Sequence, residues 1–425
     1  MSESNQPRGT TSDRRRFLKS VAGAGALAAV SGRLPGQEKG TITIERLDKA
    51  AAAPVLKLDG LDDPVKVASV ELLRGKGAIF VRARSADGAE GLAVTNGRAE
   101  YFHPIFQKLV APYFVGKDAR QLESLLDGVY RHRSNYKLSG LALWCCVAWV
   151  EMSLLDMLGK ITRKPVGELL GGVVRRKVPV YVASGRRKTT PQQEAALLAK
   201  SVEQTGVKAV KFKVGGRMSN NADSLPGRTE GLVPLVRKTL GDAITLHADA
   251  NGSYDAPKGT EVGNLMADHG YEFFEEPCPF DHLEETKRVA DAVSVPVAGG
   301  EQETSARRFR WMVRQGAVQV VQPDLHYNGG FIRAARVARV AAAAGLTIVP
   351  HMSGGGLGYV DVLHFVSCTP NAGKFHEYKG GIERTGEWYD PPLKLTDGAI
   401  NVPTGPGLGL TAQAAIFQNA RKVGP

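Results

Sequence analysis

Acidic, lysine and histidine residues recur along this chain at nearly constant intervals. From Lys213 onward, each of the next six candidates lies 23 to 36 residues beyond the one before it. Each stands at or just after the end of an apolar run. The motifs are VKFKV (Lys211 and Lys213), LHADAN (Asp249), FFEEP (Glu275), AGGE (Glu301), VQPD (Asp324), IVPH (His351) and KFHEY (Glu377). Taken singly, such motifs are common and mostly structural. Their shared register indicates that successive strand–helix units carry them to one rim.

Three of these residues have the chemistry of metal ligands. Asp249, Glu275 and Glu301 would bring three carboxylates together from three neighbouring strands. Hard oxygen donors of this kind suit Mg²⁺, with Mn²⁺ as the alternative ion. No cysteine or additional histidine shares the spacing, which argues against zinc. The sequence therefore predicts one Mg²⁺ per site.

The remaining candidates suit proton transfer. Lys211 and Lys213 are two residues apart on a strand, so both side chains point into the barrel. They could neutralise a substrate carboxylate, and one of them could act as a base. Asp324 and His351 end adjacent strands, so the carboxylate could orient the imidazole as a general acid or base. Glu377 closes the ring opposite the lysines.

The elements that must hold these groups form a β/α alternation after Lys177. Eight strands are predicted, separated by helical stretches, and together they indicate a TIM-type barrel. An open doubly wound sheet is the alternative, but its glycine-rich turn is missing after the first strand. The predicted strands are Val178–Ala183, Ala209–Val214, Ile244–Ala248, Tyr271–Glu275, Pro296–Ala298, Val318–Gln322, Leu346–Pro350 and Lys374–Tyr378.

The chain before this barrel has a different pattern of predicted strands and helices. Two strand-like runs, Val65 to Leu72 and Ala78 to Arg84, precede a helical region whose strongest piece is Leu141 to Leu158. We therefore predict a small α+β domain over residues 41–176 and a barrel over 177–379. Residues 380–425 form a C-terminal segment.

Bulk charge does not indicate a nucleic-acid partner. The formal charge is +12, but residues 1–39 contribute seven basic and three acidic side chains. The remaining excess is scattered and not interleaved with aromatic residues, so a small anionic substrate fits better than nucleic acid.

The N-terminus has the features of an export signal. The sequence DRRRFLK, from Asp13 to Lys19, precedes the apolar, small-residue stretch Val21 to Val30. That stretch is about half the length of a membrane span, so no stable membrane anchoring is expected. Consecutive arginines before Phe-Leu-Lys resemble a twin-arginine signal. We expect residues 1–40 to direct the protein to the periplasm.

With these motifs assembled, the chain resembles the enolase superfamily, specifically the mandelate racemase/muconate lactonizing enzyme family. The likeness spans about Val65 to Gly409 and includes VEMSLLDMLGKITRKPVGELLGG, from Val150 to Gly172. The resemblance implies a (β/α)7β barrel with an N-terminal α+β capping domain, to which the C-terminal segment returns. It also implies a homo-oligomer. Because Asp324 stands where the muconate lactonizing subgroup has lysine, the resemblance is to the mandelate racemase-like subgroup.

The resemblance assigns roles residue by residue. It implies that Asp249, Glu275 and Glu301 hold the metal, and that Lys211, Lys213, Asp324, His351 and Glu377 act in catalysis. The implied reaction is Mg²⁺-dependent removal of the proton α to a carboxylate, a pattern already described for this superfamily. Three further residues are predicted to contact substrate: Asn251, Arg186 in a basic loop after the first barrel strand, and His326.

Three outcomes remain open for that chemistry. The preferred one is dehydration of an acid sugar, aldonate or aldarate, to a 2-keto-3-deoxy acid. The alternative is racemisation or epimerisation of a 2-hydroxy acid, which the same bases could perform. A non-catalytic periplasmic sugar-acid binding protein is the third, although binding alone needs no base.

Overall fold

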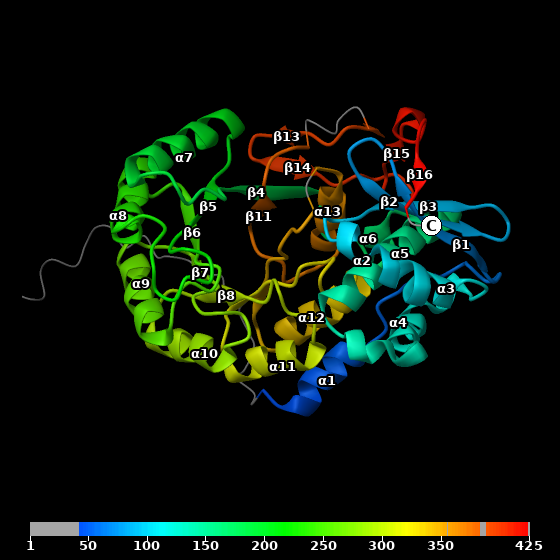
Figure 1. The fold of residues 1–425 in the computed structure, drawn as a ribbon, viewed down its shortest axis with the longest axis horizontal. Coiled ribbons are helices and arrows are strands. Elements are labelled where there is room, and N and C mark those ends of the chain that lie inside the picture. Colours follow the sequence, from blue (N-terminus) through cyan, green and yellow to red (C-terminus); the bar gives the residue numbers. More distant parts are fainter. Residues whose placement is uncertain (1–41, 355, 383–387, 424–425) are drawn as a thin grey trace, which may run out of the picture. The chain divides into compact units, whose positions relative to one another are not determined.

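The computed structural model describes residues 42–354, 356–382 and 388–423. The predicted export segment, residues 1–40, lies outside them. The described chain contains a barrel and an α+β cap (Figure 1).

Eight parallel strands form the barrel, and all eight overlap the predicted runs. Neighbouring strands pair in chain order, and the last strand pairs in parallel with the first. A bridge between Ile348 and Ala372 joins the two remaining neighbours, which closes the ring. The strands are β4 (Lys177–Ala183), β5 (Ala209–Lys213), β6 (Thr245–Asp249), β7 (Phe273–Glu275), β8 (Val297–Gly299), β9 (Val320–Val321), β10 (Thr347–Ile348) and β11 (His376–Tyr378).

Helices follow the first seven of these strands and cover the barrel on the outside (Figure 1). The first of them shows how sequence sets an element's ends. Thr190 and Gln193 form a reciprocal capping box, Pro191 opens the helix, and Gly206 ends it in the left-handed conformation. The helices are α7 (Pro191–Thr205), α8 (Arg228–Leu240), α9 (Ala256–Asp268), α10 (Leu283–Ala292), α11 (Ala306–Gln315), α12 (Phe331–Ala343) and α13 (Tyr359–Ser367). This order is the predicted (β/α)7β barrel.

The cap combines an antiparallel sheet with helices. Its strand order is β16-β1-β2-β3, in which β16 comes from the end of the chain. The strands are β1 (Val67–Arg74), β2 (Ile79–Ser85), β3 (Glu90–Val94) and β16 (Arg421–Lys422). The helices before the barrel are α1 (Ile44–Ala52), α2 (Ala99–Ile105), α3 (Ala111–Phe114), α4 (Leu122–Arg131), α5 (Leu141–Thr162) and α6 (Val166–Leu169). Of these, α1 packs on the barrel helix α12.

Helix α5 is the central core element of the cap. It is the one helix among the described residues that is long and apolar enough to cross a membrane, but 89% of its apolar window is buried within the protein. Its length and hydropathy are therefore those of a core helix. The buried carboxylate of Glu151 on α5 accepts hydrogen bonds from the backbone N–H groups of Phe331 (2.9 Å) and Ile332 (2.7 Å). This contact ties the cap to the first turn of barrel helix α12.

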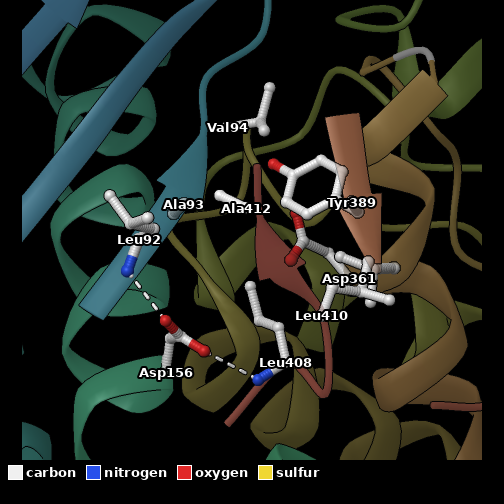
Figure 2. A pocket seen from close by; sticks show the side chains of 10 residues that line it. Leu92, Ala93, Val94, Asp156, Asp361, Tyr389, Leu408, Leu410 and Ala412 are labelled. Atoms are coloured by element: carbon white, nitrogen blue, oxygen red, sulfur yellow. Dashed lines mark hydrogen bonds between the residues drawn. The ribbon is translucent and has the colours of Figure 1, made fainter. Parts of the chain in front are cut away.

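The C-terminal segment joins both parts of the structure. Strand β14 (Ala399–Asn401) pairs with β4 and with β13 (Leu395–Thr396), and β12 (Tyr389–Asp390) pairs with β15 (Thr411–Ala412). The Asp156 carboxylate on α5 accepts from the backbone N–H groups of Leu92 and Leu408, both at 2.8 Å. Figure 2 shows these bonds beside a small cavity of about 20 Å³, into which Asp361 points. Asp156 thus fastens the returning segment to strand β3.

Candidate active site

Three carboxylates converge at the carboxyl ends of barrel strands. Asp249 ends β6, Glu275 ends β7, and Glu301 follows β8. Each is at most 5% exposed, and one oxygen atom from each lies within 4.8 Å of the others. The trio is the only cluster of at least three acidic, histidine or cysteine ligands of this closeness in the described chain. Three carboxylate oxygens without a nitrogen or sulfur donor fit Mg²⁺ well.

Both lysines of β5 reach this cluster. Lys211 is buried, and its Nζ lies 2.7 Å from Glu275 Oε1 and 2.9 Å from Glu377 Oε1. The Nζ of Lys213 forms an ion pair with Asp249 Oδ2. Since residues 211 and 213 share one face of the strand, the two ammonium groups enter the barrel side by side.

The pKa values of the carboxylates diverge because their partners differ. Burial and the neighbouring carboxylates raise the pKa of Glu275 to about 7, although Lys211 opposes the shift. Burial acts in the same direction on Asp249, but Lys213 and Lys211 hold the pKa of that carboxyl below its usual range. Without a metal ion, Glu275 therefore takes up a proton near neutral pH, whereas Asp249 stays ionised.

The predicted His–Asp pair forms at the ends of β9 and β10. His351 Nδ1 lies 2.7 Å from Asp324 Oδ2, and Nε2 lies 3.1 Å from Glu301 Oε2. Burial alone would lower the pKa of His351, but Glu301, Glu377 and Asp324 raise it overall. The imidazole is thus held by one carboxylate and directed at the metal trio by its other nitrogen.

Glu377 on β11 lies between two cations. Burial disfavours its charged form, but Lys211 and Lys379 hold the pKa of this carboxyl well below its usual range. Lys379 Nζ is 3.1 Å from Glu377 Oε2 and 3.0 Å from His351 Nε2. Glu377 therefore stays ionised between the lysine pair and the His–Asp pair.

The residues predicted to bind substrate are placed differently from one another. Asn251 lies beside the metal trio, and its backbone N–H donates to Asp249 Oδ1 at 2.7 Å. Arg186 pairs with buried Glu194, with Nε 3.0 Å from Oε2. His326 is buried, and its Nε2 lies 3.6 Å from Asp361 Oδ2. The structure therefore brings Asn251 to the site and turns the Arg186 side chain toward α7.

Several residues at the site were not predicted from sequence. Gln322 donates to Glu275 Oε2 at 2.8 Å, and Lys379 contacts His351 and Glu377. Each stands two residues from a predicted site residue. The alternation of side chains along an extended segment was the signal that could have found them. Arg187 belongs to the basic loop predicted to contact substrate, but Arg186 was the residue singled out there, and it is Arg187 that reaches the site; no pattern distinguishes between adjacent arginines in a loop.

Comparison with known families agrees with this geometry. The family model described as Mandelate racemase / muconate lactonizing enzyme, N-terminal domain, matches residues 55–171. The model described as Enolase C-terminal domain-like matches residues 193–416, more than half of the chain. The chain belongs to the mandelate racemase/muconate lactonizing enzyme family of the enolase superfamily. The resemblance inferred from the motifs is confirmed, and so is the capped-barrel fold.

Two relatives carry the names of a dehydratase and a cycloisomerase. An arabinonate dehydratase of Saccharolobus solfataricus is 25% identical over 85% of this chain and 93% of its own length. A D-galactarolactone cycloisomerase of Agrobacterium fabrum is 28% identical over 82% of this chain and 92% of its own length.

A solved structure extends the comparison to metal binding. It is a mandelate racemase/muconate lactonizing protein of Paracoccus denitrificans complexed with magnesium. It has 26% identity and a TM-score of 0.77, with 84% of this chain and 99% of that chain covered. The protein is an enzyme, a metal-dependent lyase or racemase of this superfamily.

Proposed function

We propose that the enzyme dehydrates an acid sugar, an aldonate or aldarate, to a 2-keto-3-deoxy acid with Mg²⁺ at Asp249, Glu275 and Glu301. One observation carries the proposal: two groups able to transfer protons reach the same carboxylate cluster from different strands. Lys213 of β5 pairs with Asp249, and His351 after β10 lies 3.1 Å from Glu301. A site that only bound a sugar acid would need neither base.

The cations around the cluster would prepare the substrate for proton loss. Mg²⁺, when bound, would supply a Lewis acid that draws negative charge toward the substrate carboxylate. Lys211, buried against Glu275 and Glu377, keeps its positive charge beside the same position. Negative charge that develops on the carboxylate oxygens as the α-proton leaves is stabilised by this fixed ammonium group.

Proton transfer then involves the two opposed groups. Whichever of Lys213 and His351 is unprotonated takes the α-proton, and the electron pair of the C–H bond forms the C=C bond as the β-hydroxyl departs. The other group donates a proton to that hydroxyl, so that water leaves. The resulting enol takes up a proton at the β-carbon and loses the proton of its hydroxyl group, which gives the 2-keto-3-deoxy acid. Asp324 keeps the imidazole in the orientation that this step requires, because it accepts from Nδ1.

The names of the relatives favour dehydration. Arabinonate dehydratase matches over most of its length, and several D-galactonate dehydratases match at 26–27% identity. Racemisation is the second candidate, since the same two bases could remove a proton on one face and return one on the other. The presence of a β-hydroxyl in the substrate decides between these outcomes.

The test is a screen of aldonic and aldaric acids with the purified enzyme and MgCl₂. Products are detected as 2-keto acids by semicarbazone absorbance and identified by NMR. We expect at least one acid to yield a 2-keto-3-deoxy product, and Lys213→Ala to reduce that rate by at least about 100-fold.

The same screen in deuterated water separates the alternatives. Inversion or exchange at the α-carbon without water loss would show a racemase or epimerase. Tight binding of an acid with neither exchange nor product in any sample would contradict catalysis and favour the binding-protein alternative.

A further inference from the structure

Two arginine side chains next to the metal trio donate hydrogen bonds to the same neutral amide oxygen. Arg187 Nη2 donates to Asn251 Oδ1 at 2.8 Å, and Arg217 Nη2 donates to the same oxygen at 3.1 Å. Arg187 lies in the loop after β4 and Arg217 in the loop after β5, so both stand on the rim that carries the catalytic candidates. Neither guanidinium forms an ion pair with any described residue.

The backbone around both arginines is held in place. Arg228, which is 1% exposed, donates to the carbonyl oxygens of Thr189 (2.8 Å) and Arg186 (3.3 Å), on either side of Arg187. The N–H of Met218, next to Arg217, donates to the carbonyl oxygen of Asn251 at 3.1 Å. The backbone of both loops is therefore anchored; the Arg187 side chain is partly buried and the Arg217 side chain is exposed.

The guanidinium groups of Arg187 and Arg217 have no anionic partner among the described residues, and their surroundings favour one. The Nε of Arg187 is buried and has no hydrogen-bond partner among the described atoms, so one of the two donors on its Nε–Nη2 edge is vacant. Burial lowers the pKa of Arg187, and the nearby charge of Arg217 lowers it further, against the pull of Asp249. An Nε–Nη2 edge matches the two oxygens of a carboxylate, which can accept both hydrogen bonds.

We propose that Arg187 and Arg217 form a second carboxylate subsite, so that the preferred substrates of the proposed dehydration are dicarboxylic acid sugars, that is, aldarates. Asn251 joins the two subsites, because its backbone N–H binds Asp249 while its side-chain oxygen faces the arginines. Glu276 contacts the opposite, nitrogen end of the same amide at 3.3 Å, so the amide separates it from the guanidinium groups. A short polyhydroxy chain would span from the metal trio to the arginine pair.

This inference rests on the proposed function, so its first test uses turnover. The aldarate and aldonate of each configuration are compared by kcat/KM in the wild type, Arg187→Met and Arg217→Met. We expect the aldarate to be preferred, and each substitution to lower its kcat/KM by about 10- to 100-fold, the effect of losing a charged hydrogen bond. The value for the aldonate should change less than about threefold. Lys188→Met, which removes an exposed positive charge from the same loop, is the matched control and should leave the preference unchanged.

A structural role for the arginines predicts a different result. If they only positioned Asn251, both substrate types would lose activity equally in Arg187→Met. That outcome, or a wild-type preference for aldonates, would overturn the subsite while leaving the dehydratase proposal intact.

A second measurement does not require turnover. Thermal unfolding with MgCl₂ is followed in the presence of unreactive straight-chain dicarboxylates, malonate to adipate, and monocarboxylates of equal length. We expect at least one dicarboxylate to raise Tm more than its monocarboxylate counterpart in the wild type and Lys188→Met, and this difference to vanish in Arg187→Met. If no acid sugar reacts, this comparison of Tm shifts alone tests the second carboxylate subsite. Equal shifts for the two series would overturn the subsite.

Discussion

Asp324 and His351 are paired twice, through a parallel backbone bridge and through a side-chain contact of 2.7 Å between Oδ2 and Nδ1. The backbone pairing of the strand ends therefore fixes the distance between the two residues, whatever rotamers their side chains adopt. With Nδ1 engaged by Asp324, Nε2 is the nitrogen left to face Glu301 and a substrate. The imidazole is held in one direction, as expected of a general acid or base.

This arrangement predicts that the two bases act on opposite stereoisomers. In deuterated water, His351→Asn should abolish α-proton exchange for the isomer whose proton faces β10 and spare the other. Lys213→Ala should do the reverse, and Asp324→Asn should weaken the His351-dependent exchange by a smaller factor. NMR of the recovered acid measures the exchange. Changes below about tenfold in both single variants, or roughly 1.4 kcal/mol in barrier, would refute both assignments.

A second prediction concerns the metal ligands. Glu275→Gln should weaken Mg²⁺ binding by at least about tenfold, because a neutral amide replaces a charged ligand at the centre of the trio. Isothermal titration measures the affinity, and circular dichroism checks that the barrel remains folded. Glu276→Gln is the comparison. Native affinity in Glu275→Gln, with loss in Glu276→Gln, would move the ligand to the adjacent residue.

Magnesium affinity should also depend on pH in a defined direction. In the metal-free protein the pKa of Glu275 is raised to about 7, so below that pH a proton occupies the carboxyl that the metal needs. Binding should weaken as the pH falls from 8 to 6, by up to about tenfold per unit below 7, with the release rising toward one proton per ion as the pH falls. Titrations in buffers of different ionisation enthalpy count that proton. A constant affinity from pH 6 to 8 would show that Glu275 is already ionised.

A fourth prediction tests the contact between cap and barrel. Gly330 precedes α12 with φ 106°, and a Cβ there would lie 2.3 Å from Glu151 Oε2. Gly330→Ala should therefore lower the free energy of unfolding by about 2–4 kcal/mol, from backbone strain and from the displaced carboxylate. Gly140→Ala is the matched control, because Gly140 precedes α5 in a similar conformation (φ 136°, ψ −165°, against 106° and −174° at Gly330) but has nothing within 4 Å of an added Cβ. It should cost less, about 1–2 kcal/mol from backbone strain alone. Equal losses in the two variants would mean that the contact with Glu151 contributes nothing.

The last prediction concerns export. Replacing Arg14, Arg15 and Arg16 together with lysine should retain the protein in the cytoplasm, because a twin-arginine signal is read through its arginines. Cell fractionation followed by immunoblotting measures the distribution, with an unaltered chain expressed in parallel. Periplasmic delivery of the lysine variant at the normal level would show that this segment is not read as a twin-arginine signal.

The barrel could be predicted from sequence because two regularities coincide in it. Its strands are short apolar runs, and each ends in a polar residue that the barrel places on one rim. The convergence of Asp249 and Glu275 could therefore be predicted from the sequence alone, and the structure confirms it. The same reasoning located Lys213 beside Asp249, which the structure shows as an ion pair.

Contacts that depend on loops and on the end of the chain were less predictable. Strand β3 was not predicted, and β14 pairs with β4 although its three residues carry no strand pattern. Arg186 and Arg187 are identical in type and adjacent, so only the loop conformation set by buried Arg228 decides which side chain faces Asn251. Glu151 lies within an apolar helical run. Its partners are backbone N–H groups about 180 residues away, and amino-acid composition gives no signal for such a contact.

The pairing of β16 with β1 sets the order in which the cap can be completed during synthesis. Strand β1 leaves the ribosome early, but one of its edges gains its neighbour only when Arg421 and Lys422 emerge. Until then that edge exposes unpaired backbone groups, which invite pairing with other chains. A nascent chain that stops short of these residues would therefore carry a finished barrel and an open cap. Completion of the cap sheet therefore waits until Arg421 and Lys422 have been synthesised, after the whole of the barrel.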